Sequence, residues 1–428
     1  MIIQVILVFF YLWLGFNITR SNTFLQKIVL LVVSLYGFQI LLAILDPYQI
    51  YKISNKTVVL FNLQILFILF GVHAFIKKGY RNNFVFTPKV FKISINRTII
   101  VVQTLLLYLS INRYQKMQSF LNSAGVLTNE ARNYYYTELY SSYTEKLLNQ
   151  IVNAYSIISY FFIFGLLLFY PQKLKLKHYY VIISGLAVVI LDSLSSGGRA
   201  VIFQLIVIFM LFFFYGRSIN KSDFRKKIIP LAIALLAIVS YFFVQITLLR
   251  TNNTDSDVVL NSIDLFIVQP FAMYLYGPVC AFDYGSQYIF NDLVPMFGAA
   301  DFAGIIDFLI TPFQFFDHSI QGINNILGAK MTPQFVFPSG ITWNALFTGA
   351  SNYYIDFGVF GFVIFPFVHG CLLAFICNKA LKNGMWFVLL LWIFKFSYNQ
   401  LSSSGIQSMS IVFTFFWIWY IHREKAFS

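Results

Sequence analysis

The chain has 428 residues, of which 59% are hydrophobic, 20% are aromatic and only 11% are charged, with a formal net charge of +14. Globular proteins carry about 25% charged residues, so this chain has too few charges to cover a water-facing surface. The composition excludes a soluble enzyme, a disordered chain and a secreted disulfide scaffold. It predicts an all-α polytopic integral membrane protein.

Apolar runs predict about eleven transmembrane helices, because a helix needs ~20 apolar residues to cross a bilayer. In chain order these runs cover residues 2–16, 27–45, 58–76, 95–111, 151–170, 178–195, 200–215, 228–248, 355–377, 385–400 and 406–421. We therefore expect residues 1–428 to form a single polytopic membrane domain.

The basic residues predict how the chain is oriented in the membrane. Most of the 30 Lys and Arg residues lie in alternate connections, such as residues 77–94 and 216–227. Short connections rich in Lys and Arg stay in the cytoplasm, so the N-terminus is expected outside and the C-terminus in the cytoplasm. The net positive charge thus indicates topology, and no nucleic-acid partner is expected.

Two long external segments are predicted, at residues 112–150 and 249–354. The second is too long for a structureless connection, and long loops of this kind are usually functional. It contains apolar stretches at 263–276 and 302–316 that are interrupted by prolines. They predict short helices that lie at the membrane interface or re-enter the membrane around a cavity.

A polar turn follows the sixth predicted span and contains Gly197, Gly198 and Arg199. The glycines let a ligand approach backbone N–H groups, the next helix begins with a partial positive charge, and arginine presents a forked set of donors. Arg250 ends the eighth predicted span on the same side. Two nearby guanidinium groups would bind a diphosphate, whereas the alternative is that each arginine only anchors its helix among lipid headgroups.

His318 is the external histidine among the five in the chain, and it follows Asp317. An imidazole with a pKa near neutrality could remove a proton from a hydroxyl group, although a structural hydrogen-bonding role is the alternative. No metal-ligand spacing or nucleotide-binding motif is present, so neither a metal nor a cofactor is expected. The external carboxylates that compete with His318 as bases or line the same cavity are Asp192, Asp283, Asp317 and Asp356.

Two stretches carry a resemblance to a known family. Residues 195–199 (SSGGR), which lead directly into an apolar helix, and residues 344–361 (NALFTGASNYYIDFGVFG) resemble the two landmarks of the O-antigen polymerase (Wzy-type) family. The order of the spans and the one large external loop are similar over most of the chain. The resemblance implies an integral-membrane glycosyltransferase bundle of the GT-C-like kind, in the bacterial cytoplasmic (inner) membrane.

Such polymerases transfer a growing glycan from undecaprenyl pyrophosphate to the next lipid-linked repeat unit on the periplasmic face, and a polysaccharide chain-length regulator is an implied partner. By this resemblance, Arg199 matches the motif arginine and Arg250 matches an arginine that opens the large loop. His318 is proposed by position only. Apart from the resemblance, tyrosines of the large external loop could provide surfaces on which sugars stack, although aromatic residues make up 20% of the whole chain; they are Tyr274, Tyr276, Tyr284 and Tyr288.

The motif around Asp356 also has a structural interpretation. Gly358 and Gly361 would let helices approach closely, and a carboxylate at the start of the ninth span favours a helix N-terminus. Two other functions remain open: an O-antigen ligase, which would share the arginines, and a flippase for lipid-linked oligosaccharides, which would more often show two related halves and charges near the bilayer midplane.

Overall fold

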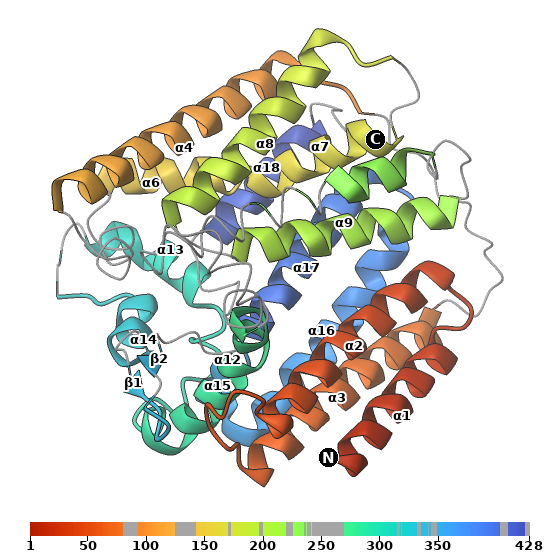
Figure 1. Ribbon diagram of the computed structural model, residues 1–428, viewed down its shortest axis with the longest axis vertical. Helices are drawn as coiled ribbons and strands as arrows, with labels where there is room; N and C mark the ends of the chain where they lie inside the picture. Colours follow the sequence, from red (N-terminus) through yellow and green to blue (C-terminus); the bar gives the residue numbers. More distant parts are fainter. Residues whose placement is uncertain are drawn as a thin grey trace, which may run out of the picture. The chain divides into compact units, whose positions relative to one another are not determined.

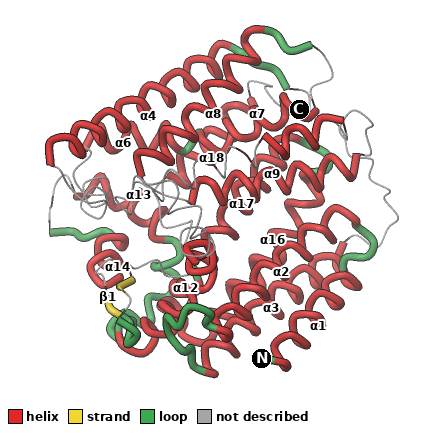
Figure 2. The backbone as a smooth tube through the Cα atoms, in the orientation of Figure 1, coloured by secondary structure: helices red, strands yellow, loops and turns green. Residues whose placement is uncertain are grey.

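Helices form nearly all of the computed structural model. It describes residues 1–79, 93–124, 143–169, 173–196, 200–219, 226–234, 237, 241, 269–314, 317, 319–331, 335–340, 342–343, 349–402 and 410–423. Within these ranges the strands are the two-residue antiparallel partners β1 (Phe335–Val336) and β2 (Thr342–Trp343). Figure 2 shows the same predominance of helix, which confirms the predicted helical class.

The helices follow the apolar runs of the sequence (Figure 1). In chain order they are α1 (Ile2–Ile18), α2 (Thr23–Leu45), α3 (Asn55–Gly79), α4 (Arg97–Ala124), α6 (Tyr143–Asn153), α7 (Ser156–Phe169), α8 (Leu176–Ser196), α9 (Ala200–Ile219), α12 (Gln269–Tyr288), α13 (Ala303–Gln314), α14 (Ile323–Met331), α15 (Ala350–Phe357), the 3-10 turn η2 (Gly358–Phe360), α16 (Gly361–Ala380), α17 (Gly384–Ser402) and α18 (Ser410–Arg423). The predicted 228–248 span lies mostly outside the described residues.

Five helical segments of the described chain are long and apolar enough to cross a membrane. They are Thr23–Leu45, Asn55–Ile76, Gln150–Phe169, Leu176–Ser195 and Ala350–Ala380. Shorter apolar helices lie at Ile2–Ile18, Leu205–Ser218, Ala303–Phe313 and Gly384–Phe394. These helices indicate a membrane-embedded protein, while the count of eleven spans and the GT-C-like arrangement stay predictions.

The internal contacts divide the chain into two compact units. Unit 1 comprises Met1–Thr87, Gln269–Leu381 and Trp392–Val412, and unit 2 comprises Pro88–Val268, Lys382–Leu391 and Phe413–Ser428. The expectation of one domain over residues 1–428 stays a prediction.

In unit 1, α3 and α16 cross at two glycines. A methyl group added at Gly71 would lie 2.1 Å from the carbonyl oxygen of Phe367, and one added at Gly370 would lie 2.1 Å from that of Ile68. The Sγ of Cys371 donates a hydrogen bond to the Gly71 carbonyl at 3.3 Å. Small residues at such a crossing allow the backbones of two apolar helices to approach closely.

The Gly358 and Gly361 pair forms the junction between α15 and α16. Gly358 has a φ of 59°, a left-handed conformation that favours glycine. A methyl group at Gly361 would lie 1.9 Å from the carbonyl oxygen of Tyr353. Gly361 therefore allows the start of α16 to lie close to the backbone of α15, as predicted. Gly358 has a different role, because its left-handed conformation turns the chain between the two helices.

In unit 2, α7 and α9 pack through aromatic side chains. The ring of Phe212 lies 5.5 Å from that of Phe164 and 5.9 Å from that of Phe169. Phe387, at the start of α17, packs on Phe212 and Tyr215 with ring centroids 4.9 and 4.8 Å apart. Such offset and edge-on pairs add to the stabilisation from burial alone.

Contacts between helix ends agree with the predicted topology. In unit 1, the Asn22 amide donates to Asn378 at 2.6 Å, and both residues lie on the predicted cytoplasmic side. In unit 2, the Lys177 ammonium donates to the carbonyl of Ile95 at 2.8 Å, again joining two predicted cytoplasmic ends. Each contact places two segments on one side of the membrane, and which side faces the cytoplasm stays a prediction.

Candidate functional site

The connection between α2 and α3, residues 46–54, is fixed at its start by one aspartate. Asp46 ends α2 in a left-handed conformation with a φ of 41°. Its carboxylate accepts hydrogen bonds from the backbone N–H of Ile50 at 2.7 Å and of Tyr51 at 3.1 Å. The hydroxyl of Tyr276, on α12, donates to the same carboxylate at 3.2 Å. We call residues 46–54 the 46–54 loop.

Asp283 of α12 fixes the other end of this loop. Its buried carboxylate accepts from the backbone N–H of Ser54 at 3.0 Å and from the Ser54 hydroxyl at 2.5 Å. The Thr57 hydroxyl and the Gln287 amide also donate to it, the latter at 3.1 Å. The predicted site residue Asp283 thus holds the start of α3 against α12.

An aromatic cluster lies beside Asp283 and is formed by Tyr51, Tyr284, Tyr288 and Phe337. Ring centroids are 4.8 Å apart for Tyr284 and Tyr288, 5.3 Å for Tyr51 and Phe337, and 6.1 Å for Tyr51 and Tyr284. Phe337 is buried, whereas Tyr288 is 67% exposed. The cluster therefore has a buried base and an exposed aromatic rim.

Polar groups adjoin the rim of the aromatic cluster. The Gln287 amide lies 3.5 Å from the Tyr51 hydroxyl. Partial burial, together with the Asp283 carboxylate, raises the pKa of Tyr51 to about 12, so this hydroxyl stays protonated and can donate at neutral pH. Exposed ring faces beside an amide and a hydroxyl can bind a ligand that has one apolar face and several hydroxyl groups.

A cation lies close to Tyr354 of α15 in the same unit. The Lys56 ammonium donates to the Tyr354 hydroxyl at 3.2 Å and lies 5.0 Å from the centre of that ring. This contact joins the start of α3 to α15, with both groups partly in solvent.

Asp356 organises the turn that precedes α13. Its two oxygens accept from the backbone N–H groups of Ala300 at 2.8 Å and Asp301 at 2.9 Å. The Asn352 amide donates to the Ala300 carbonyl at 3.0 Å. Asp356 is fully buried, and these contacts support the structural interpretation of the motif.

Asp301 was not expected from the sequence. It is 2% exposed, and burial, reinforced by the neighbouring Asp356 carboxylate, raises the pKa of Asp301 well above its usual range. Two carboxyl groups in a poorly solvated place cannot both ionise without large cost, so Asp301 favours its protonated form.

Asp192 of α8 forms an ion pair with Arg113 of α4 in unit 2. The Arg113 guanidinium lies 2.9 Å from the Asp192 carboxylate, and the two side chains are 6% and 22% exposed. Arg113 also donates to Ser110 and Asn153 at 3.0 Å each. The predicted external ends of the fourth and sixth spans therefore meet through this pair.

Asp317 lies on the surface, and its carboxylate accepts from the backbone N–H of Ser319 at 2.9 Å. Hydrogen bonds from the Ser319 hydroxyl and N–H lower the pKa of Asp317. Arg199, Arg250, His318, Gly197 and Gly198 lie outside the described residues. Their assignment stays a prediction.

The sequence predicted two of the four members of the aromatic cluster. Tyr284 and Tyr288 were predicted, whereas Tyr276 is buried against Asp46 and the side chain of Tyr274 lies outside the described residues. Tyr51 and Phe337 were missed because nothing local in the sequence joins residues so far apart. Asp46 directly after an apolar run is the one sequence signal that could have predicted the start of the 46–54 loop, because an aspartate side chain often accepts hydrogen bonds from the backbone N–H groups that follow it.

Within the described ranges, no three His, Cys, Asp or Glu side chains lie together so as to hold a metal ion. Comparisons of the chain with protein-family models, with curated proteins and with solved structures return no match.

Proposed function

We propose that this chain is a membrane-embedded glycosyltransferase that polymerises lipid-linked oligosaccharides, as the resemblance to O-antigen polymerases implies. The observation that best supports the proposal is the aromatic cluster with its exposed Tyr288 and adjacent Gln287, at an end of unit 1 that the charge pattern predicts to be external. Sugars offer an apolar ring face to aromatic side chains and hydroxyl groups to amides. The membrane is the bacterial cytoplasmic membrane in this proposal, and the external side is the periplasm.

The proposed donor is a glycan on undecaprenyl pyrophosphate, and the acceptor is the next lipid-linked repeat unit. A hydroxyl oxygen of the acceptor attacks the anomeric carbon of the donor, its proton passes to a base, and the bond from that carbon to the diphosphate oxygen breaks. Negative charge then accumulates on the departing diphosphate. Arg199 and Arg250 would stabilise this charge more strongly in the transition state than in the ground state.

The contacts of the candidate bases narrow the choice of base. Asp192 is paired with Arg113, Asp283 accepts four hydrogen bonds, and Asp356 accepts from two backbone N–H groups. The oxygens of each of these carboxylates are therefore occupied by partners within the fold. Asp317 likewise accepts a hydrogen bond from Ser319, which lowers its pKa, so His318 is the base that we propose.

Deletion of the gene in its host tests the reaction class. Loss of the long polysaccharide ladder, with a single repeat unit still attached at the surface, is the result expected for a polymerase. Complete loss of repeat units would instead identify an O-antigen ligase or a flippase and would contradict the proposal.

Complementation then tests the aromatic cluster. A variant with both Tyr284→Ala and Tyr288→Ala should restore at most about a tenth of the polymer, because losing one stacked contact of about 1.4 kcal/mol changes binding tenfold. Tyr108→Ala is the matched control, since it removes an exposed tyrosine of α4 outside the cluster. Full polymer from the double variant would remove the cluster from the proposed site.

A further inference from the structure

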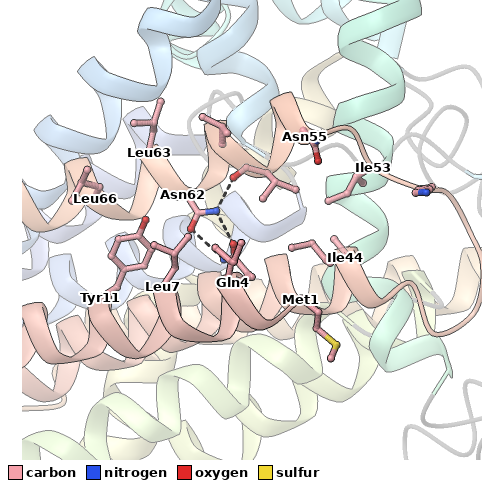
Figure 3. A pocket seen from close by; sticks show the side chains of 15 residues that line it. Met1, Gln4, Leu7, Tyr11, Ile44, Ile53, Asn55, Asn62, Leu63 and Leu66 are labelled. Carbon is pink, nitrogen blue, oxygen red and sulfur yellow. Dashed lines mark hydrogen bonds between the residues drawn. The ribbon is translucent and has the colours of Figure 1, made fainter.

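A cavity of about 510 Å³ opens between α1, α2, α3 and the 46–54 loop in unit 1. Figure 3 shows side chains that line it, among them Leu7 and Tyr11 of α1 and Leu63 and Leu66 of α3. Its volume falls within the roughly 300–1,000 Å³ of pockets that hold small molecules. Nothing in the aromatic cluster or the diphosphate chemistry uses this cavity.

Two polar side chains of the cavity lining, Gln4 and Asn62, are paired with each other. The Gln4 amide donates to Asn62 at 3.1 Å, and the Asn62 amide donates to Gln4 at 2.9 Å and to the Val58 carbonyl at 2.8 Å. The dashed lines in Figure 3 mark this exchange. The two amides satisfy one another, and most of the other lining residues are aliphatic, so the wall suits a hydrocarbon chain.

The cavity communicates with a surface that is apolar. Ile3 and Val59 line it and are 75% and 56% exposed. The outward face of α1 continues this surface with Phe9 and Trp13, which are 67% and 62% exposed. In a membrane-embedded protein such a face contacts lipid, so the cavity is open to the bilayer.

The length of the cavity matches one leaflet. It is lined along α3 from Asn55, at the helix start, to Leu66. At 1.5 Å per residue this is about 16 Å. The hydrocarbon core of a bilayer is about 30 Å thick, so the cavity reaches from the membrane surface to about the midplane.

One end of the cavity carries a positive charge. Lys52 belongs to the lining and lies in the 46–54 loop, next to Tyr51 of the aromatic cluster. Asp46 and Asp283 hold the two ends of this loop, and the Ser339 hydroxyl donates to the Ile50 carbonyl at 2.7 Å. Lys52 is therefore held at this end of the cavity by a fixed backbone.

From this geometry we propose that the cavity binds one acyl chain of an anionic phospholipid, whose phosphate lies against the Lys52 ammonium. The apolar wall, the one-leaflet depth, the opening toward lipid and the positive mouth each correspond to a part of such a molecule. The proposal does not depend on the glycosyltransferase function.

Native mass spectrometry of lipids retained by the full chain tests this proposal. The protein is reconstituted in nanodiscs of equal phosphatidylglycerol and phosphatidylcholine, extracted into detergent and analysed for bound lipid. We expect phosphatidylglycerol to be retained preferentially. Lys52→Gln should lower that preference about fivefold, since a lysine near anionic lipid contributes about 1 kcal/mol.

Two further variants distinguish the contribution of the Lys52 charge from the contribution of the cavity to lipid retention. Lys330→Gln removes a different exposed lysine, one paired with Asp292 at 3.0 Å, and should leave retention unchanged. Leu63→Trp should fill the cavity and abolish retention of both lipids, with helical content and monodispersity checked by circular dichroism and size-exclusion chromatography.

Several results would overturn the proposal. Equal retention of the two lipids by the unaltered chain, or an unchanged preference in Lys52→Gln, would exclude the headgroup contact. Undiminished retention in a folded Leu63→Trp variant would exclude the cavity as the binding place. Displacement of the retained phosphatidylglycerol by an equal amount of added polyprenyl phosphate would exclude a phospholipid as the preferred occupant of the cavity.

Discussion

Asp301 places a carboxyl group where water cannot solvate its charge. Its pKa is raised by burial and by the nearby Asp356 carboxylate, so the folded protein binds a proton there more tightly than the unfolded chain does. A group of this kind contributes stability fully below the unfolded pKa of about 4, and that contribution is lost as the pH rises toward the folded pKa.

Asp301→Asn should therefore stabilise the protein relative to the unaltered chain, and the gain should increase as the pH is raised from about 4. Asparagine keeps the size of the side chain and removes its titration. Thermal unfolding in detergent between pH 4 and pH 8 measures the difference. Asp292→Asn, at a carboxylate whose side chain is 75% exposed, serves as the control. A difference that does not vary with pH would exclude Asp301 as a group that binds a proton on folding.

Arg199→Lys tests the proposed diphosphate contact, because lysine keeps the positive charge and loses the forked geometry. We expect polymer formation to fall about 100-fold, as when one preorganised donor is removed from a transition state. Arg20→Lys, at an exposed arginine on the predicted cytoplasmic side, should have no effect. Unchanged polymer from both Arg199→Lys and Arg250→Ala would contradict the assignment of these arginines.

The contacts of single residues were harder to predict from the sequence than the helices. Asp283 and Asp356 were recognised as carboxylates on the external side, but their partners Ser54 and Ala300 lie far away in the sequence. Only the fold brings such groups together, so the sequence could suggest their chemistry without showing that their oxygens were already bound. Tyr51 was missed for the same reason.

The packing of helix pairs depends on how closely their backbones approach, and in unit 1 α3 and α16 cross at two glycines, Gly71 and Gly370. Gly370→Ala would push a methyl group into the Ile68 carbonyl. We expect a loss of about 1–3 kcal/mol in the free energy of unfolding, as for other overpacked sites. The measurement is the thermal unfolding midpoint in detergent.

Gly15→Ala is the matched control for that prediction, because a methyl group there would contact the side chains of Leu69 and Val29 at an ordinary 3.4 Å. It should change stability little. If Gly370→Ala were as stable as Gly15→Ala, the close crossing of α3 and α16 would not be needed for folding.

The helices themselves were largely predictable, since apolar runs of sufficient length have few other stable structures in lipid. Several of the described helices depart from the prediction, among them α13, which continues through Pro312. α12 continues through Pro278, where the sequence indicated an interruption, and it is buried over Val279–Phe282. α4 runs well beyond the predicted end at residue 111, and on this extension Arg113 and Lys116 form ion pairs with Asp192 and Glu145.

At the scale of the whole molecule, the orientation in the membrane is open to direct test. Two variants each place a cysteine at an exposed position. Lys330→Cys places it in the predicted external segment, and Arg423→Cys places it at the predicted cytoplasmic end. A membrane-impermeant maleimide should label the first in intact spheroplasts and the second only after lysis. The unaltered chain controls for its own three cysteines. Labelling in the opposite order would reverse the topology and move the aromatic cluster to the cytoplasm.

The central claim is that the chain joins lipid-linked repeat units, and reconstitution tests it most directly. The purified full chain is placed in liposomes with an undecaprenyl-pyrophosphate-linked repeat unit, and the products are separated by size. The account predicts a ladder of glycans that differ by one repeat unit, with undecaprenyl pyrophosphate released at each step. A single unextended repeat unit, whether unmoved, moved across the bilayer or transferred only to a lipid A core, would contradict it.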